Sequence, residues 1–347
     1  MTIVNSIEID NIRYIKNDIK EAIKKNIPIE DKLHMIICIS NPCLYARRYI
    51  LSREFKERML KDFSDSVILY IVELAFDLPG EKPQEFYVTE KDNPRHLQLR
   101  TSSNPLWHKE NLWNLGVKLL PPNWKAVCFS DADIEYDNLH FATDTLKILN
   151  GTRDVLQVYS HCLDLDLDLK PMNIFSSFSY QYANKQPYTG LGIHYHHPGY
   201  NISMTRKAYD TLGGIYQDSI LGSGDHNFFL CMINKGIKSI NEHSSEGYKK
   251  SITDYEKKCA QLRLGYTPGV IKHYFHGSKE SRGYSSRWKI LIKHQFCPRK
   301  HITTDKNGLL IPSDECPQEL LDDIMSYFKS RNEDEHYIDH LNGRTSH

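Results

Sequence analysis

One apolar run of this chain ends in a pair of carboxylates: Val127-Cys128-Phe129-Ser130-Asp131-Ala132-Asp133. Side chains alternate along a strand, so carboxylates two residues apart point the same way and can converge on one divalent cation where the strand ends. Oxygen ligands suit Mg²⁺ or Mn²⁺, and these ions often share their coordination shell with substrate phosphates. A polar strand end in a turn is the alternative, because Asp-x-Asp is a short pattern.

Upstream of this run, the chain alternates between predicted strands and helices. Two apolar runs, 34–40 and 67–75, have the length of buried strands, and helices are expected at 44–61 and 107–120. The alternation predicts an α/β fold with a mostly parallel central sheet and helices on both faces. Ligands of such sheets bind beyond the carboxyl ends of the strands, which is where the two aspartates fall.

After residue 150 the pattern changes. Residues 155–160 have the composition of a strand, and residues 163–169 alternate Leu and Asp strictly, which is typical of a half-exposed strand. The acidic face of this segment could bind Ca²⁺, but a solvated face that discourages edge pairing is the favoured interpretation. The acidic residues concerned are Asp164, Asp166 and Asp168.

The remaining segments complete the organisation. Isoleucines at helical spacing indicate an amphipathic helix within residues 6–26, and residues 317–329 are predicted to form another helix. Residues 176–200, rich in Tyr, His, Gly and Pro, are expected to form a loop that shapes a pocket. The polar segment after Asn332 is expected to fray.

Composition excludes several classes of protein. Lys plus Arg and Asp plus Glu each number 44 in the 347 residues, so no net field draws the molecule to nucleic acid or anionic lipid. No stretch approaches the roughly 20 apolar residues of a membrane span, and the first residues lack a secretory signal. We therefore expect a soluble cytoplasmic protein. Its eight cysteines form no Cys-x-x-Cys pair, which favours free thiols.

Gly222-Ser223-Gly224-Asp225-His226 directly precedes an apolar segment, 227–233, that is expected to be helical. Glycines allow the backbone to approach a ligand closely, and Asp225 at a helix N-terminus can either cap the helix or project into a cleft. In the second case Asp225 is a candidate general base that takes a proton from an acceptor hydroxyl.

A later segment combines imidazoles with cations. It follows the strand-like run 269–271 and offers a possible imidazole metal ligand together with cations that could grip a diphosphate. The residues are His273, His276, Lys279, Arg282 and Arg287. Lys109, on the predicted helix 107–120, could also reach a phosphate, although a solvated helix face explains its position equally well.

Taken in order, these segments resemble the GT-A fold glycosyltransferases, in particular the inverting β-galactosyltransferase type. The resemblance implies a Rossmann-like α/β fold with a mostly parallel central sheet and a smaller C-terminal acceptor-side region. The glycosyltransferase domain would span 34–300, with a nucleotide-binding half at 34–150 and an acceptor and catalytic half at 151–300. An N-terminal helical extension, 1–33, and a C-terminal helical tail, 301–347, would flank it.

The resemblance also implies roles by position. Asp133 would bind the metal, Asp131 the metal or the ribose, and either His276 or His273 would be the late metal ligand. His276 is favoured because Gly277 leaves its backbone room beside a phosphate. Asp225 would be the base, although His226 stands where the family often has a second acid. Asn41, together with Glu73 or Asp77, would border the base and ribose of the nucleotide. Residues Gly199 to Ser203 would hold the acceptor and the donor sugar.

The expected activity is Mn²⁺- or Mg²⁺-dependent transfer of a sugar from a nucleoside diphosphate sugar, expected to be a UDP-sugar, to a hydroxyl of a glycan or other acceptor, with inversion. Lys109, Lys279 and Arg282 would stabilise the diphosphate. A nucleotidyltransferase is one alternative, but residues 40–43 lack the Gly-rich loop that such enzymes carry after the first strand. A non-catalytic nucleotide-sugar-binding protein and a retaining mechanism are the others.

Overall fold

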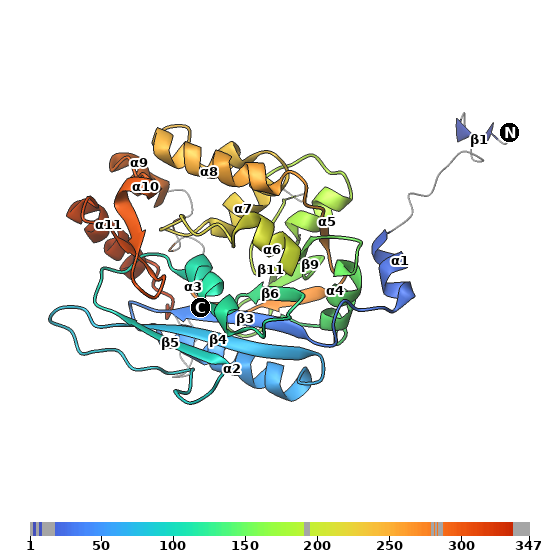
Figure 1. Cartoon of the computed structure of the whole chain (residues 1–347), viewed down its shortest axis with the longest axis horizontal. Helices are drawn as coiled ribbons and strands as arrows, with labels where there is room; N and C mark the ends of the chain where they lie inside the picture. The colour runs from blue at the N-terminus through green and yellow to red at the C-terminus, as the bar shows by residue number, and fades with distance from the viewer. Residues whose placement is uncertain are drawn as a thin grey trace.

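A seven-stranded sheet forms the centre of the computed structural model, which describes residues 3–4, 7–8, 18–190, 195–278, 281, 283 and 287–335 (Figure 1). The strand order is β12-β8-β11-β6-β3-β4-β5. In that order the strands are Leu264–Tyr266, Val155–Gln157, Asn201–Thr205, Ala126–Ser130, Leu33–Ser40, Val67–Phe76 and His96–Thr101.

One strand of this sheet is reversed. β11 pairs antiparallel with both of its neighbours, β6 and β8, whereas every other neighbouring pair is parallel. The predicted α/β class with a mostly parallel central sheet is therefore confirmed. Asp131 follows β6, and its backbone N–H donates to the carbonyl of Tyr200, just before β11, at 2.7 Å. The reversed strand thus fixes the backbone at the start of the aspartate pair.

Two apolar clusters lie on the two faces of the sheet, because successive side chains of β3 point to opposite faces. Ile36 packs with Trp113 of α3, and Met35 and Ile37 pack with Phe55 of α2. Figure 1 shows α2 and α3 on opposite sides of β3 and β4. The helices are α1 (Asp18–Lys25), α2 (Ala46–Asp62), α3 (Lys109–Gly116), α4 (Phe141–Leu149), α5 (Phe178–Ala183), α6 (Arg206–Leu212), α7 (Gly224–Met232), α8 (Glu246–Cys259), α9 (Arg287–Lys293), α10 (Pro298–His301) and α11 (Gln318–Ser330).

A second, four-stranded sheet has the order β10-β9-β13-β7, with strands Pro171–Ser176, His161–Leu165, Val270–His273 and Ile134–Tyr136. β7 begins directly after Asp133, and β13 ends with His273 opposite both Ile134 of β7 and Asp164 of β9. This sheet therefore brings the late histidine segment to the end of β6. The short strand pairs β1–β2 (Ile3–Val4 and Ile7–Glu8) and β14–β15 (Ile302–Thr304 and Leu310–Pro312) complete the strands.

Three local predictions were correct only in part. β9 ends at Leu165, and Asp164 points into the protein with 2% of its surface exposed, because its carboxylate is bonded to His273. The predicted loop 176–200 contains the helix α5, whose N-cap Ser177 accepts a hydrogen bond from the backbone of Tyr180. The expectation that this segment shapes a pocket is confirmed, because Gly190 and several residues of 195–200 line the cleft described below; residues 191–194 lie outside the described residues. The helix predicted within residues 6–26 is confirmed as α1 for Asp18–Lys25, and residues 9–17 lie outside the described residues.

The chain does not fray directly after Asn332. Glu333 is 1% exposed, because it forms ion pairs with Arg48 and Arg331 that hold the segment against the body of the protein. We call residues 331–335 the C-terminal strap. The prediction of fraying failed because the burial of Glu333 depends on both arginines, and Arg48 lies far away in the chain.

Two global expectations can be compared with the structure. All eight cysteines lie within the described residues and are free thiols, as predicted. None of the helices formed by the described residues has the length and apolar character that a membrane span requires.

Candidate active site

A cleft of about 860 Å³ lies at the carboxyl ends of β3 and β6. Its wall contains most of the charged side chains that the sequence singled out: Lys109, Asp131, Asp133, Asp225, His273 and His276. The position agrees with the general rule that ligands of parallel sheets bind beyond the strand ends. Residues far apart in the chain therefore meet in one cavity.

Asp133 and two histidines form a group that could hold a metal ion. The ligand atoms of Asp133, His273 and His276 all lie within 4.8 Å of one another. Asp133 Oδ2 is 2.9 Å from His276 Nε2 and 3.9 Å from His273 Nε2. A donor set of one carboxylate and two imidazoles fits a transition-metal ion such as Mn²⁺ better than Mg²⁺, which prefers oxygen ligands. Spacing alone had left the two histidines as alternatives, and the structure brings both to Asp133.

The space beside Gly277 is already taken. Gly277 has a φ of +91°, and a Cβ at this position would lie 3.1 Å from Glu333 Cα and 3.1 Å from the carbonyl oxygen of Arg331. The absence of a side chain at Gly277 makes room for the backbone of the C-terminal strap, and a phosphate beside the Gly277 backbone stays a prediction.

Lys109 links the aspartate pair to Asp225. Its Nζ is 3.2 Å from Asp131 Oδ1 and 3.9 Å from Asp225 Oδ2, and it lies over the ring of Trp113. Burial disfavours the charged amine, but the surrounding carboxylates prevail and raise the pKa of Lys109. Burial also raises the pKa of Asp131 to about 6, although Lys109 opposes this shift. Lys109 is therefore a shared counter-ion in the cleft and not part of a solvated helix face.

Asp225 lies in the first turn of α7, whose N-cap residue is Ser223. Its Oδ1 accepts a hydrogen bond from the backbone N–H of His226 at 2.7 Å. Burial opposes ionisation, but Lys109 and this N–H outweigh it and hold the pKa of Asp225 below its ordinary value. Asp225 is thus a carboxylate that stays ionised at neutral pH and faces the cleft, whereas Ser223 takes the cap position.

Gly224 is required by the side chain beneath it. A Cβ on Gly224 would lie 2.8 Å from Cγ of Glu110 and closer still to its carboxyl group. We expect Gly224→Ala to cost about 1–3 kcal/mol of stability, because overpacking must displace α7 or Glu110. Urea unfolding of both single variants and of the double variant with Glu110→Ala tests this. Because Glu110→Ala removes the clash, the double variant should lose less free energy of unfolding than the two single variants lose together. A loss equal to the sum of the two single losses would contradict the contact.

Glu110 should make stability depend on pH. Burial raises its pKa from 4.5 to about 7, and its Oε1 has no hydrogen-bond partner among the described residues. The folded protein therefore binds the proton of the Glu110 carboxyl group more tightly than the unfolded chain does. The contribution of this proton to the free energy of unfolding is complete below about pH 4.5 and is lost as the pH rises through 7. At about 1.4 kcal/mol per pKa unit, wild type should lose about 2–3 kcal/mol relative to Glu110→Gln over this range. Urea unfolding of both proteins near pH 4.5 and pH 8 measures the difference, and parallel pH profiles would exclude it.

Two residues predicted to contact the nucleotide are not in this cleft. The carboxylate of Glu73 accepts hydrogen bonds from the backbone N–H groups of Tyr87 and Thr89, at 2.7 and 2.8 Å, and so fixes the loop that precedes β5. Asp77 forms an ion pair with Arg100 at 2.5 Å. Neither lines the cleft, because their carboxylates serve these structural contacts.

The other predicted residues have different positions. Asn41 lines the cleft, but its side chain is engaged with the backbone of Tyr45, to which it donates at 2.9 Å and from which it accepts at 3.0 Å. Arg287 lines the cleft and donates to Ser223. Lys279 and Arg282 lie outside the described residues.

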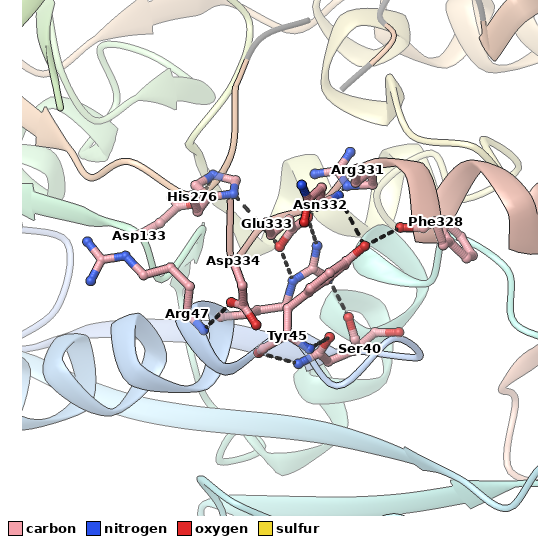
Figure 2. A network of polar contacts seen from close by, with 12 residues as sticks. Ser40, Tyr45, Arg47, Asp133, His276, Phe328, Arg331, Asn332, Glu333 and Asp334 are labelled. Atoms are coloured by element: carbon pink, nitrogen blue, oxygen red, sulfur yellow. Dashed lines mark hydrogen bonds and ion pairs between the residues drawn. The ribbon is translucent and has the colours of Figure 1, made fainter. Parts of the chain in front are cut away.

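A polar network missed by the sequence analysis borders the metal-ligand group (Figure 2). Arg48 Nε donates to Glu333 Oε2 at 2.8 Å, and Arg48 Nη1 donates to the carbonyl of Ser40, the last residue of β3. Arg331 Nε donates to Glu333 Oε1 at 2.7 Å. Burial opposes ionisation of Glu333, but the two guanidinium groups prevail and hold its pKa well below the ordinary value. No local pattern around Glu333 could have indicated this arrangement.

No protein-family model matches this chain, and no curated protein matches it. Among solved structures, the catalytic domain of Drosophila β1,4-galactosyltransferase 7 in complex with xylobiose is similar over 85% of this chain and 99% of its own, with a TM-score of 0.41 and 10% identity. A mutant of that Drosophila enzyme, in complex with manganese, UDP-Gal and xylobiose, is similar over 84% and 98%, with a TM-score of 0.39 and 10% identity. Because both TM-scores are below 0.5, the functional conclusion rests on the side chains of the cleft.

Proposed function

We propose that this chain is a metal-dependent glycosyltransferase of the GT-A type, which moves a sugar from a nucleoside diphosphate sugar, expected to be a UDP-sugar, to an acceptor hydroxyl. One observation carries the proposal: a single cleft combines a metal-ligand group, Asp133 with His273 and His276, and an ionised carboxylate, Asp225, that is not part of that group. These are the two charges that such a transfer needs, one for the leaving group and one for the acceptor.

Asp225 is proposed as the base. Its carboxylate would accept the proton of the acceptor hydroxyl while the acceptor oxygen forms a bond to the anomeric carbon. The bond from that carbon to the diphosphate oxygen breaks, and its electron pair leaves with the nucleoside diphosphate. A single displacement of this kind inverts the configuration at the anomeric carbon, so the product should have the opposite anomeric configuration to the donor.

The metal-ligand group is proposed to receive the diphosphate. A divalent cation bound by Asp133, His273 and His276 would supply positive charge that stabilises the departing diphosphate. Lys109 would orient Asp131 toward the donor and hold Asp225 in its ionised form, since its Nζ lies between the two carboxylates. Lys279 and Arg282 remain proposed contacts of the diphosphate, and Asn41 remains a proposed neighbour of the nucleotide.

The test is release of UDP from a panel of UDP-sugars, with Mn²⁺, with Mg²⁺ and with a chelator. We expect turnover of at least one donor with Mn²⁺ and none with the chelator. Asp133→Ala should abolish metal-dependent turnover, and the matched control Asp166→Ala, outside the cleft, should not. Binding of a UDP-sugar without any turnover would favour a non-catalytic binding protein, and the absence of any nucleotide binding would refute the proposal.

A further inference from the structure

Each imidazole of the metal-ligand group has a buried carboxylate behind it. Both Nε2 atoms face Asp133, and the opposite ring nitrogens face acidic side chains. His273 Nδ1 is 2.7 Å from Asp164 Oδ1, and His276 Nδ1 is 3.8 Å from Glu333 Oε2. The side chains of Asp164 and Glu333 are 3% and 0% exposed. The two carboxylates come from distant parts of the chain, β9 and the C-terminal strap.

We propose that Asp164 and Glu333 are positioning residues of a divalent-cation site, and that the C-terminal strap completes this site. The inference rests on the proposed function, because that function requires a cation at Asp133. A carboxylate at Nδ1 keeps the proton on that nitrogen, so the lone pair of Nε2 remains available to a metal ion, and it also raises the basicity of the ring.

The contacts of Glu333 leave one direction for His276. An ionised carboxylate offers about four lone-pair sites. Arg48 occupies one site on each oxygen, through Nε at 2.8 Å and Nη2 at 2.5 Å, and Arg331 Nε occupies a second site on Oε1 at 2.7 Å. The remaining site is on Oε2, the oxygen nearest to His276 Nδ1. At 3.8 Å this contact is an electrostatic one, which a small ring rotation or one bridging water would turn into a hydrogen bond.

The strap is anchored so that Glu333 cannot move independently of the histidine segment. Both carboxylate oxygens of Asp334 accept hydrogen bonds from backbone N–H groups at the start of α2, those of Ala46 and Arg47, at 2.9 and 2.8 Å. Arg47 Nε in turn donates to the carbonyl of Phe275 at 2.9 Å. Figure 2 shows Glu333 between Arg331 and His276, with Asp334 at the start of α2. The strap, α2 and the segment around His276 are therefore one connected unit.

The experiment is a Mn²⁺ titration of the nucleotide-free full chain, followed by electron paramagnetic resonance. Because loss of a carboxylate behind a metal-bound histidine typically weakens binding about 10–100-fold, we expect a loss of that size in Glu333→Gln and in Asp164→Asn. Glu333→Asp, which retains a carboxylate, should keep part of the affinity. The exposed Glu319→Gln on α11 is the control and should bind as wild type.

Two further measurements separate positioning from charge and from folding. The double variant Arg48→Met with Glu333→Gln restores the net charge, and its Mn²⁺ affinity should remain low if Glu333 acts on the ring and not through the local field. In metal-free Asp133→Ala protein, where the carboxylate 2.9 Å from Nε2 is removed, ¹⁵N chemical shifts should show protonated Nδ1 on His276, and a mixture of tautomers when Glu333→Gln is added. Mutant proteins are compared only after circular dichroism shows native folding, and the tautomer measurement needs no bound metal.

The outcomes distinguish this inference from the proposed function. If wild type binds no Mn²⁺, both the proposed function and the positioning role are wrong. If wild type binds Mn²⁺ and Glu333→Gln binds it equally well with unchanged tautomers, only the positioning role is wrong. Tighter binding of UDP by Glu333→Gln than by wild type would show instead that Glu333 competes with the donor for Arg48.

Discussion

Asp225→Asn should lower the rate of sugar transfer by about 10²- to 10⁴-fold, the usual contribution of a general base. The substitution changes almost no volume, and the Asn carbonyl can still accept the hydrogen bond that Asp225 receives from the N–H of His226. What is lost is a group that can take a proton from the acceptor hydroxyl. Nucleotide and Mn²⁺ binding should stay near wild type, because the ligand atoms of Asp133, His273 and His276 are untouched.

Single-turnover transfer with a saturating donor measures this effect, and nucleotide binding by calorimetry is measured beside it. Asp210→Asn, an exposed carboxylate on α6, is the matched control. Because Lys109 and the N–H of His226 outweigh burial and hold the pKa of Asp225 below its ordinary value, its protonation should not limit the wild-type rate near neutral pH. A wild-type rate in Asp225→Asn would exclude the base assignment, and retention of the anomeric configuration in the product would exclude the single displacement.

Lys109→Met should be the most destabilising change in the cleft, with a cost of about 3–5 kcal/mol, because it leaves buried carboxylates without their counter-ion. Asp131 and Asp225 lose their ion pairs with Nζ, and Glu110 loses the positive charge that favours its ionised form. The pKa values of these carboxyl groups should rise in the folded variant. The loss of stability relative to wild type should therefore grow as the pH rises from about 5 to about 8. In this range the carboxyl groups are ionised in the unfolded chain, whereas in the folded variant they resist ionisation.

Urea unfolding near pH 5 and near pH 8 gives both the cost and its pH dependence. Lys118→Met, at an exposed position after α3, is the control and should change stability little. Addition of Asp131→Asn to Lys109→Met should recover part of the loss, since it removes one of the like charges. An equal deficit at both pH values would show that Lys109 contributes through packing on Trp113 and not through its charge.

The central sheet and three carboxylates of the cleft could be predicted from sequence for a local reason. Apolar runs of strand length that alternate with helical segments define a parallel sheet, and polar residues directly after such runs lie at one edge. Asp131 and Asp133 follow β6, and Asp225 comes just before the apolar segment of α7. Each signal lies within a few residues of the chain, so no knowledge of distant contacts was needed.

The same reasoning failed where a side chain's environment is set by distant residues. Glu73 is within the apolar run 67–75, yet it binds the backbone of residues 87–89, a contact that its neighbours do not indicate. Asp164 alternates with leucines as an exposed residue would, but β13 covers it with His273. The second sheet was missed for a related reason, since its strands are short and the two pairings of β13, with β7 and with β9, join residues more than a hundred positions apart.

The distance along the chain between Arg48 and Glu333, 285 residues, has a consequence for the order of folding. On a ribosome, α2 and the end of β6 emerge long before the C-terminal strap is synthesised, and long-range contacts form late because loop closure costs entropy. The nascent protein should therefore assemble its sheet first and orient His276 last. During refolding from urea, native-like circular dichroism should accordingly return before high-affinity Mn²⁺ binding.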